Sequence, residues 1–206
     1  MTYLWDFFSL LPFYLIFVII PGILFIQSFF PNVNFTKGVL FLTFSVGGLI
    51  VLTFILFLLT HFVFLLSEKW NLSWFKRPNK ADNCSYLNDN SDKNDKFYNI
   101  GLPSHHAAIA TYAFLVVGLI FIDVPFISHF LILILFIGWL FTLASRIMKN
   151  CENLLQVIIG IIIGLLYFFK IHLRFIHKFL PDSLPINVLP YTVRLPIILS
   201  FPFIIL

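Results

Sequence analysis

Four side chains suited to phosphate chemistry lie at the edges of apolar segments of the sequence: Arg77, Ser104, His106 and Arg146. Arginine binds phosphate well because its forked N–H donors match the non-bridging oxygens. Ser104 follows Pro103 at a predicted helix start, where free backbone N–H groups favour an anion. His106 suits a general acid near neutral pH that protonates a leaving oxygen. These residue types predict a site for a phosphate ester or diphosphate at a membrane surface.

Two lysines near Arg77 extend this candidate phosphate site. Lys69 and Lys76 lie in the same polar segment as Arg77. A lysine is a mobile point charge on a flexible stem, so either residue can contact a phosphate. The alternative is an ordinary basic patch beside a membrane, which needs no ligand.

Three further polar residues are candidates at the same site. Glu152 is expected at a helix start near Arg146, where the helix dipole and the arginine both favour a carboxylate. Gln156 follows four residues later, so the two side chains are expected to share one helix face. His105 directly precedes His106 and is expected to point elsewhere on the helix.

The elements that position these residues are apolar helices. The chain has 206 residues, of which 60% are hydrophobic, and a mean hydropathy of +1.00, which no soluble core needs. Apolar runs of about 20 residues recur, and each can cross a hydrocarbon layer of about 30 Å. We therefore predict one all-α domain over residues 1–206, a polytopic membrane helix bundle of five or six spans. The predicted spans are 7–30, 38–66, 104–122, 126–144 and 152–169, with a kinked span or re-entrant piece at 187–206.

Small residues within these spans predict close helix contacts. Gly47-Gly48 lies in the second span, and Gly160 and Gly164 have helical spacing in the fifth. Such glycines let two helix backbones approach each other. His61 in the second span is expected to be a packed histidine with a local partner.

The polar segments divide between two sides of the predicted membrane. Residues 67–102 form a long polar loop, predicted to be disordered around 85–97, and residues 145–151 form a short break on the same side. The candidate site residues are therefore expected to converge at that end of the bundle. Residues 170–185 lie on the other side and alternate basic with apolar residues, as interfacial anchors do.

Cysteines and sequons leave the orientation open. Cys84 and Cys151 fall on the side that carries the candidate site; two free thiols are favoured, and a disulfide is the alternative if that side is lumenal. The sequons at Asn34, Asn71 and Asn83 occur on both sides and do not settle the orientation.

The charge pattern narrows the range of partners. The net charge is +4, and the basic residues cluster in loops rather than along a helix or stripe. That pattern suits membrane lipids and lipid phosphates, and it argues against nucleic acid as a partner.

Three short motifs, in this order, resemble the signature of the type 2 phosphatidic acid phosphatase superfamily: Arg77-Pro78, Pro103-Ser104-His105-His106 and Ser145-Arg146. The second motif is specific, and the other two depart from the family pattern. The resemblance covers about residues 38–170. Within the superfamily, the dolichyl diphosphate phosphatase branch is the most similar. Two segments match the pattern of this branch: Gly101 to His106, and Ser145 to Gly164. In the second segment the last position of the third motif is Gln156, as in this branch, whereas other branches of the superfamily usually have Asp there.

This resemblance implies roles for individual residues. Arg77, Ser104 and Arg146 would bind the phosphate, and His106 would protonate the leaving group. Lys69 or Lys76 would replace a family lysine whose position is here Trp70. The family needs no metal or other cofactor. Its most similar branch implies a polyprenyl (dolichyl) diphosphate substrate, the endoplasmic reticulum membrane and protein N-glycosylation.

Glu152 occupies the position of the family's nucleophilic histidine. A carboxylate can serve as a nucleophile or base. Alternatively, Glu152 pairs with Arg146 and fills the phosphate pocket, which would make the protein a lipid-phosphate-binding relative. A phosphatase for phosphatidate or a sphingoid phosphate is a third reading. A small transporter or channel component ranks last because the spans are nearly bare of mid-span polar residues.

Overall fold

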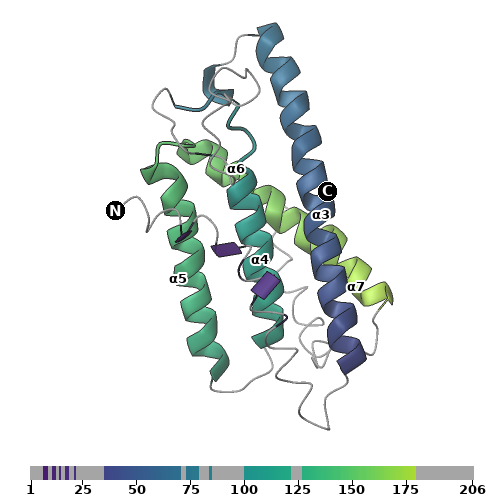
Figure 1. Ribbon diagram of the computed structural model, residues 1–206. Coiled ribbons are helices and arrows are strands. Elements are labelled where there is room, and N and C mark those ends of the chain that lie inside the picture. Colours follow the sequence, from purple (N-terminus) through teal and green to yellow (C-terminus); the bar gives the residue numbers. More distant parts are fainter. Residues whose placement is uncertain are drawn as a thin grey trace, which may run out of the picture.

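The computed structural model describes residues 7–8, 11–12, 14, 17–18, 21, 35–70, 73–78, 84, 100–121 and 127–179. Within these ranges the four long helices are α3 (Phe35–Trp70), α4 (His105–Phe121), α5 (Ile127–Met148) and α6 (Leu154–Tyr167) (Figure 1). Helix α6 continues through a π-helical turn, η4 (Phe168–His172), into α7 (Leu173–Phe179). No strand occurs in the described ranges beyond an isolated bridge between Lys76 and Ile100, so the all-α prediction is confirmed there.

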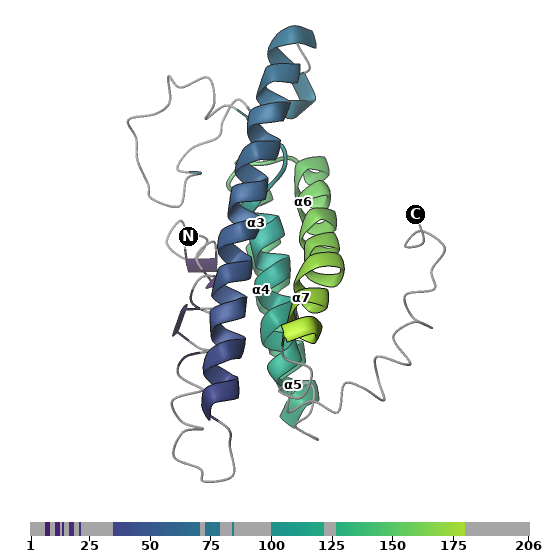
Figure 2. The same cartoon turned by 90° about the vertical axis from the view of Figure 1, so that its right-hand side faces the viewer.

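Helix α4 is the centre of the bundle. It packs against α3, α5 and α6, and α3 projects beyond the other helices at one end (Figure 2). The sequence of α4 allows this position because most of its side chains are small or β-branched, so three neighbours can approach. Its buried apolar residues are Ala107, Ala108, Ile109, Ala110, Tyr112, Ala113, Val116 and Val117.

Two glycines of α6 bring its backbone close to that of α4. A Cβ atom added to Gly160 would lie 2.5 Å from the backbone oxygen of Ser104, and one added to Gly164 would lie 2.6 Å from that of Ala108. No side chain fits at such distances, so these glycines permit the contact, as the spacing predicted. The contact brings the first turns of both helices side by side.

A second close contact joins α3 to α4 and η4. A Cβ on Gly48 would lie 2.8 Å from the His172 ring, whereas one on Gly47 would meet nothing within 4 Å. The close-approach prediction therefore holds for Gly48 alone. The Tyr112 hydroxyl donates to the backbone oxygen of Ser45 over 2.9 Å and lies 3.1 Å from His172 Nδ1.

His172 corrects the prediction for residues 170–185. Its side chain is buried rather than at an interface, because the helix continues through η4 and α7 to Phe179 and the π-helical turn faces His172 inward. His61 was predicted to be a packed histidine with a local partner. Its side chain is exposed on α3, so the packed part of that prediction is wrong.

Two described helices are long and apolar enough to cross a membrane, Thr43–Trp70 and Leu154–Ile176, and two shorter apolar helices accompany them, His105–Leu119 and Ile132–Met148. Large apolar side chains cover the outward face of α3, as a lipid-facing helix requires: Ile50, Phe54, Phe57, Phe62 and Leu65. The predicted count of five or six spans is not confirmed by the described residues. The predicted piece at 187–206, the loop centre at 85–97 and most of the span at 7–30 lie outside them.

Two predicted boundaries are also corrected. Helix α3 runs to Trp70, so the polar segment begins later than residue 67. Helix α5 runs to Met148, so Ser145 and Arg146 lie in its last turn rather than in a break. A basic side chain in that position is favourable because it faces the negative end of the helix dipole.

Candidate functional site

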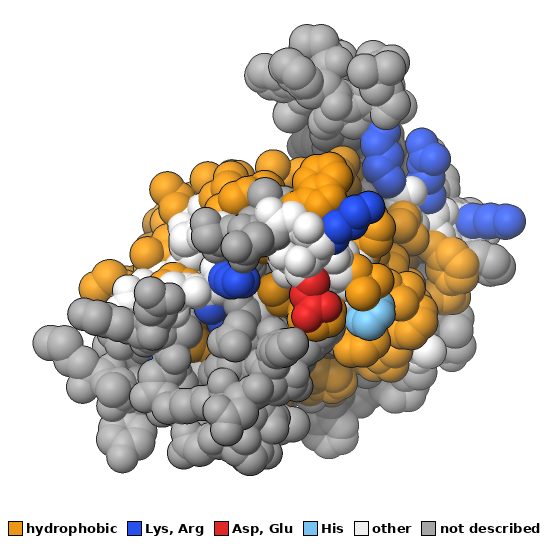
Figure 3. All heavy atoms as spheres, turned by 90° about the horizontal axis from the view of Figure 1, so that it is seen from above, with side chains coloured by type: hydrophobic (Ala, Val, Ile, Leu, Met, Phe, Trp, Pro, Cys, Tyr) orange, Lys and Arg blue, Asp and Glu red, His pale blue; other side chains and the backbone are white. Residues whose placement is uncertain are grey.

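The predicted site residues gather at one end of the bundle, where α5 ends and α4 and α6 begin. This end also carries the turn η2 (Ser73–Phe75) and the following residues to Pro78. Figure 3 views the molecule from this end and shows Lys and Arg side chains among apolar ones. The helix ends and the turn that carry the predicted site residues therefore lie together at one end of the bundle, as expected.

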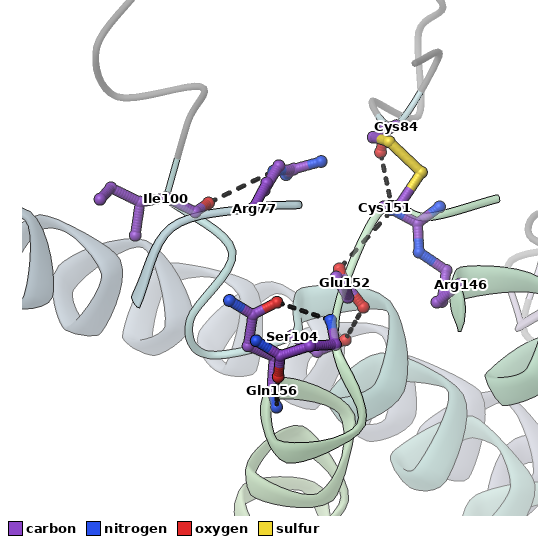
Figure 4. Close-up of a disulfide and its surroundings, with 9 residues drawn as sticks. Arg77, Cys84, Ile100, Ser104, Arg146, Cys151, Glu152 and Gln156 are labelled. Atoms are coloured by element: carbon purple, nitrogen blue, oxygen red, sulfur yellow. Dashed lines mark hydrogen bonds and ion pairs between the residues drawn. A yellow bond between two sulfur atoms is a disulfide. The ribbon is translucent and has the colours of Figure 1, made fainter. Parts of the chain in front are cut away.

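Glu152 is the residue on which Ser104 and Arg146 converge (Figure 4). The Ser104 hydroxyl donates a hydrogen bond of 2.5 Å to Glu152 Oε2, and Arg146 Nη2 lies 3.6 Å from Oε1. All three residues are at most 3% exposed. The predicted pairing of Glu152 with Arg146 is thus present. Two donors, one immediately before α4 and one in the last turn of α5, hold one carboxylate, which is the arrangement that a phosphate would also require.

Arg146 has a second partner in the disulfide-bonded residue Cys84. Its Nη2 donates to the backbone oxygen of Cys84 over 2.9 Å, and Cys84 is bonded to Cys151. The expectation of two free thiols is therefore wrong. The two Cα atoms lie 5.4 Å apart, inside the range that a disulfide needs. Their separation of 67 residues in sequence gave no sign of this proximity.

Helix α6 begins with a capping box that explains where Glu152 points. The Asn153 side chain accepts from the backbone N–H of Gln156, and the Gln156 side chain accepts from that of Asn153, each over 2.9 Å. Glu152 precedes this cap, so it lies outside the helix. The prediction that Glu152 and Gln156 share a helix face is therefore wrong. The signal was present in the sequence, since Asn-x-x-Gln before an apolar run is typical of such a start.

Gln156 joins three segments of the site. Its amide Nε2 donates to the backbone oxygen of Lys76 over 3.0 Å, with longer contacts to those of Trp74 and Phe75. Its own backbone oxygen accepts from the Ser104 N–H over 3.4 Å. Gln156 therefore joins the segment before Arg77 and the start of α4 to α6.

Arg77 lies on the opposite side of Glu152 from Arg146 in Figure 4. Its Nε donates to the backbone oxygen of Ile100 over 3.4 Å, beside the bridge between Lys76 and Ile100. The side chain is half-buried. Its charge acts on both His105 and His106, so it belongs to the same cluster of polar groups.

The two adjacent histidines have different surroundings. His106 is buried, and the charges of Arg146, Arg77 and Lys149 act on it. The His105 Nε2 lies 2.7 Å from the hydroxyl of Thr60 on α3, so its ring is turned toward that helix, as expected for the supporting residue. Nothing in the sequence pattern identified Thr60 as its partner.

The two lysines are not brought into this cluster. Lys69 lies in the last turn of α3 and Lys76 beside η2, and both side chains are exposed. Among the described residues, neither side chain contacts Ser104, Glu152 or Arg146. Their place is at the rim of the site rather than in it.

The comparison with protein families agrees with the motifs. The family model described as the PAP2 superfamily matches residues 38–179, which includes every candidate site residue. No curated protein and no solved structure matches the chain. Members of this superfamily are phosphatases and are typically membrane-associated, which fits the two apolar helices. The superfamily match spans more than half of the sequence, and the chain belongs to the PAP2 superfamily.

Proposed function

We propose that this protein is a membrane phosphatase that hydrolyses a lipid-linked diphosphate, with a polyprenyl diphosphate of the dolichyl type as substrate. The observation that carries the proposal is the convergence of Ser104 and Arg146 on the Glu152 carboxylate. That carboxylate marks where these donors hold an oxyanion, and a phosphoryl group offers the same kind of oxygen.

The remaining roles follow from position and charge. Arg77 and Arg146 balance the charge of the phosphoryl oxygens from two sides, and the first turn of α4 adds backbone N–H groups. His106, buried beside them, protonates the oxygen that leaves. Lys69 and Lys76 are exposed near the same end, where they attract anionic headgroups from a distance. No cofactor is part of this proposal.

The choice of a dolichyl-type substrate rests on the motifs, above all on Gln156 in the third. Its amide donors meet backbone oxygens of the segment 74–76, a task that a carboxylate could not perform. The Cys84–Cys151 disulfide lies at the same end as the site. Disulfides persist in oxidising compartments, which favours a site on the lumenal side of the endoplasmic reticulum membrane. A phosphatase in protein N-glycosylation fits that location.

A second candidate function is lipid-phosphate binding without turnover. It is favoured by the same ion pair, because Glu152 already occupies two donors that a phosphate would need. A fixed internal carboxylate competes with the substrate at no cost in association entropy. A third candidate is a phosphatase for phosphatidate or a sphingoid phosphate. It differs from the first candidate only in its substrate.

The test is phosphate release by the purified protein from dolichyl diphosphate and from phosphatidate, with a chelator present. We expect release from dolichyl diphosphate, and loss of it in Arg146→Ala. Arg174→Ala is the matched control, since Arg174 is an exposed arginine on α7. Release from phosphatidate alone would favour the third candidate.

Glu152→His separates the first two candidates. If Glu152 only blocks the pocket, the histidine removes the block, supplies a nucleophile and raises activity above that of an inactive parent. If Glu152 takes part in turnover, the parent is active and Glu152→Gln loses that activity. A parent that binds the lipid and remains inactive with histidine would contradict the phosphatase proposal and support the binding protein.

A further inference from the structure

The surroundings of Ser104 are those of a nucleophile. A residue that only binds phosphate does not need them. Its hydroxyl donates to Glu152 Oε2 over 2.5 Å, and its oxygen accepts from the backbone N–H of Ala107 over 3.1 Å. A hydroxyl nucleophile requires an adjacent base, and that base must be oriented by a third group. Glu152 meets the first requirement, and Arg146, 3.6 Å from its other oxygen, meets the second.

We propose that Ser104 is the nucleophile of this phosphatase and that Glu152 is its general base, so that turnover passes through a seryl phosphate. This inference rests on the proposed function and adds a route for the chemistry. It replaces a missing histidine nucleophile by a serine and carboxylate that are already in contact.

The contacts of Glu152 favour it as a base rather than as the attacking group. Its Oε2 accepts the Ser104 hydroxyl and its Oε1 faces Arg146, so both oxygens are engaged. Carboxylates accept the proton of an attacking hydroxyl in other phosphoryl transfers, such as those of protein kinases. A carboxylate aimed at a hydroxyl hydrogen is in the position that this role requires.

The contacts of Ser104 support charge on its oxygen. The Ala107 N–H and the N-terminus of α4 both stabilise negative charge as the O–H bond breaks. Position is fixed by α6, because Gly160 lies against the backbone oxygen and Cβ of Ser104. The hydroxyl therefore keeps its direction toward Glu152.

The first step transfers the terminal phosphoryl group to the enzyme. Ser104 Oγ forms a bond to the terminal phosphorus while its proton passes to Glu152. The bond from that phosphorus to the bridging oxygen breaks, and this oxygen takes the electron pair and a proton from His106. The products are the lipid monophosphate, a seryl phosphate, neutral His106 and protonated Glu152.

The second step restores the enzyme. A water oxygen forms a bond to phosphorus and gives one proton to His106. The bond between phosphorus and Ser104 Oγ breaks, and Oγ regains its proton from Glu152. Inorganic phosphate leaves, and all three side chains return to their starting states.

The test identifies the phosphorylated residue in the full-length protein. The probe is dolichyl diphosphate radiolabelled in its terminal phosphate, mixed with excess enzyme and quenched rapidly in neutral detergent. Portions are then treated with acid, neutral hydroxylamine or strong alkali. Acid removes phosphohistidine, hydroxylamine removes phosphohistidine and acyl phosphate, and strong alkali removes acyl phosphate and phosphoserine. We expect label that survives acid and hydroxylamine, is lost in alkali, and maps to Ser104 by mass spectrometry.

Variants supply the second readout. Ser104→Ala should remove the label and lower phosphate release by about 10³-fold or more, as for other nucleophile–base units. Ser67→Ala should keep both, because Ser67 is a buried serine of α3 whose hydroxyl donates to the backbone oxygen of Phe64 in its own helix. In Glu152→His, acid-labile label would show that the nucleophile had moved to the new histidine.

Each remaining outcome is decisive. Label that survives acid but is lost in hydroxylamine would make Glu152 the nucleophile and overturn the inference while leaving the phosphatase proposal intact. Acid-labile label in the parent would make a histidine the nucleophile, with the same consequence. Phosphate release with no label in the parent would show direct attack by water, with the same consequence. No release and no label would overturn both proposals.

Discussion

Arg146 donates a hydrogen bond of 2.9 Å to the backbone oxygen of Cys84, the residue whose sulfur is bonded to Cys151. The guanidinium therefore contacts both the Glu152 carboxylate and the backbone oxygen of the disulfide-bonded Cys84. Five residues lie between Arg146 and Glu152 along the chain, and Cys151 immediately precedes Glu152. The disulfide thus fixes Cys84 against the turn that carries Glu152.

Removal of this disulfide should destabilise the protein and weaken its phosphate site. For Cys84→Ser with Cys151→Ser we expect a loss of about 2–4 kcal/mol in the free energy of unfolding, typical for a native disulfide. We also expect a higher KM for the lipid diphosphate, because Arg146 loses its fixed acceptor. Denaturant unfolding in detergent and phosphate-release kinetics measure the two effects. Wild-type protein treated with a reductant should behave alike; unchanged stability in both would show that the two cysteines are not bonded.

Gly160→Ala should disturb the site through the α4–α6 contact. The new Cβ would lie 2.5 Å from the backbone oxygen of Ser104, so one helix must move. Overpacking of this kind costs about 1–3 kcal/mol of unfolding free energy. Phosphate release should fall as well, because Ser104 moves with its helix.

Gly47→Ala is the matched control for this substitution. It also adds one methyl group to a helix, but at a position with nothing within 4 Å. Its stability should stay the same or rise, since alanine favours helices by about 1 kcal/mol over glycine. Equal losses in the two variants would contradict the backbone contact.

Gln156→Glu should be more harmful than its small change in shape suggests. The amide nitrogen donates to backbone oxygens, and a carboxylate oxygen in its place would face those oxygens without a donor. A buried acceptor left unsatisfied costs about 1–3 kcal/mol, and more when it is charged. Thermal unfolding should show a lower Tm for Gln156→Glu than for Gln156→Ala. The reverse order would show that the amide donors are unimportant.

His106 and His105 should differ sharply when replaced. His106→Ala should lower phosphate release by about 10²–10⁴-fold, the usual contribution of a general acid. His105→Ala should have a much smaller effect, because its ring nitrogen bonds to Thr60 on α3. Thr60→Val removes the same bond with little change in shape, so it should match His105→Ala in phosphate-release assays. Equal losses at both histidines would mean that the acid is misassigned.

The helical class could be predicted from the sequence because apolar length alone implies helices in a membrane. Glycine spacing correctly placed Gly160 and Gly164 at a helix contact, since so few residues allow backbones to touch. Helix ends were less predictable. Arg146 looked like a loop residue by polarity, but a basic side chain is favourable in the last turn of α5.

The sequence allowed us to predict which residues form the candidate site, but not which of them contact one another. Motif order identified Ser104, Arg146 and Glu152, and charge suggested the pairing of the last two. The hydrogen bond between Ser104 and Glu152 joins residues 48 apart, which no local pattern encodes. The same holds for the disulfide and for the contact between Thr60 and His105, because both depend on how separate segments pack.

The glycine contact between α4 and α6 divides the surface of α6 into two regions with unequal freedom to change during evolution. Toward α4, Gly160 and Gly164 admit no larger residue without a shift of backbone. Away from it, Leu155, Ile158, Ile162 and Leu166 are exposed large apolar side chains, which only need to remain apolar. Homologues that keep the site should therefore have various aliphatic residues at these four outer positions. At Gly160 and Gly164, homologues should keep glycine.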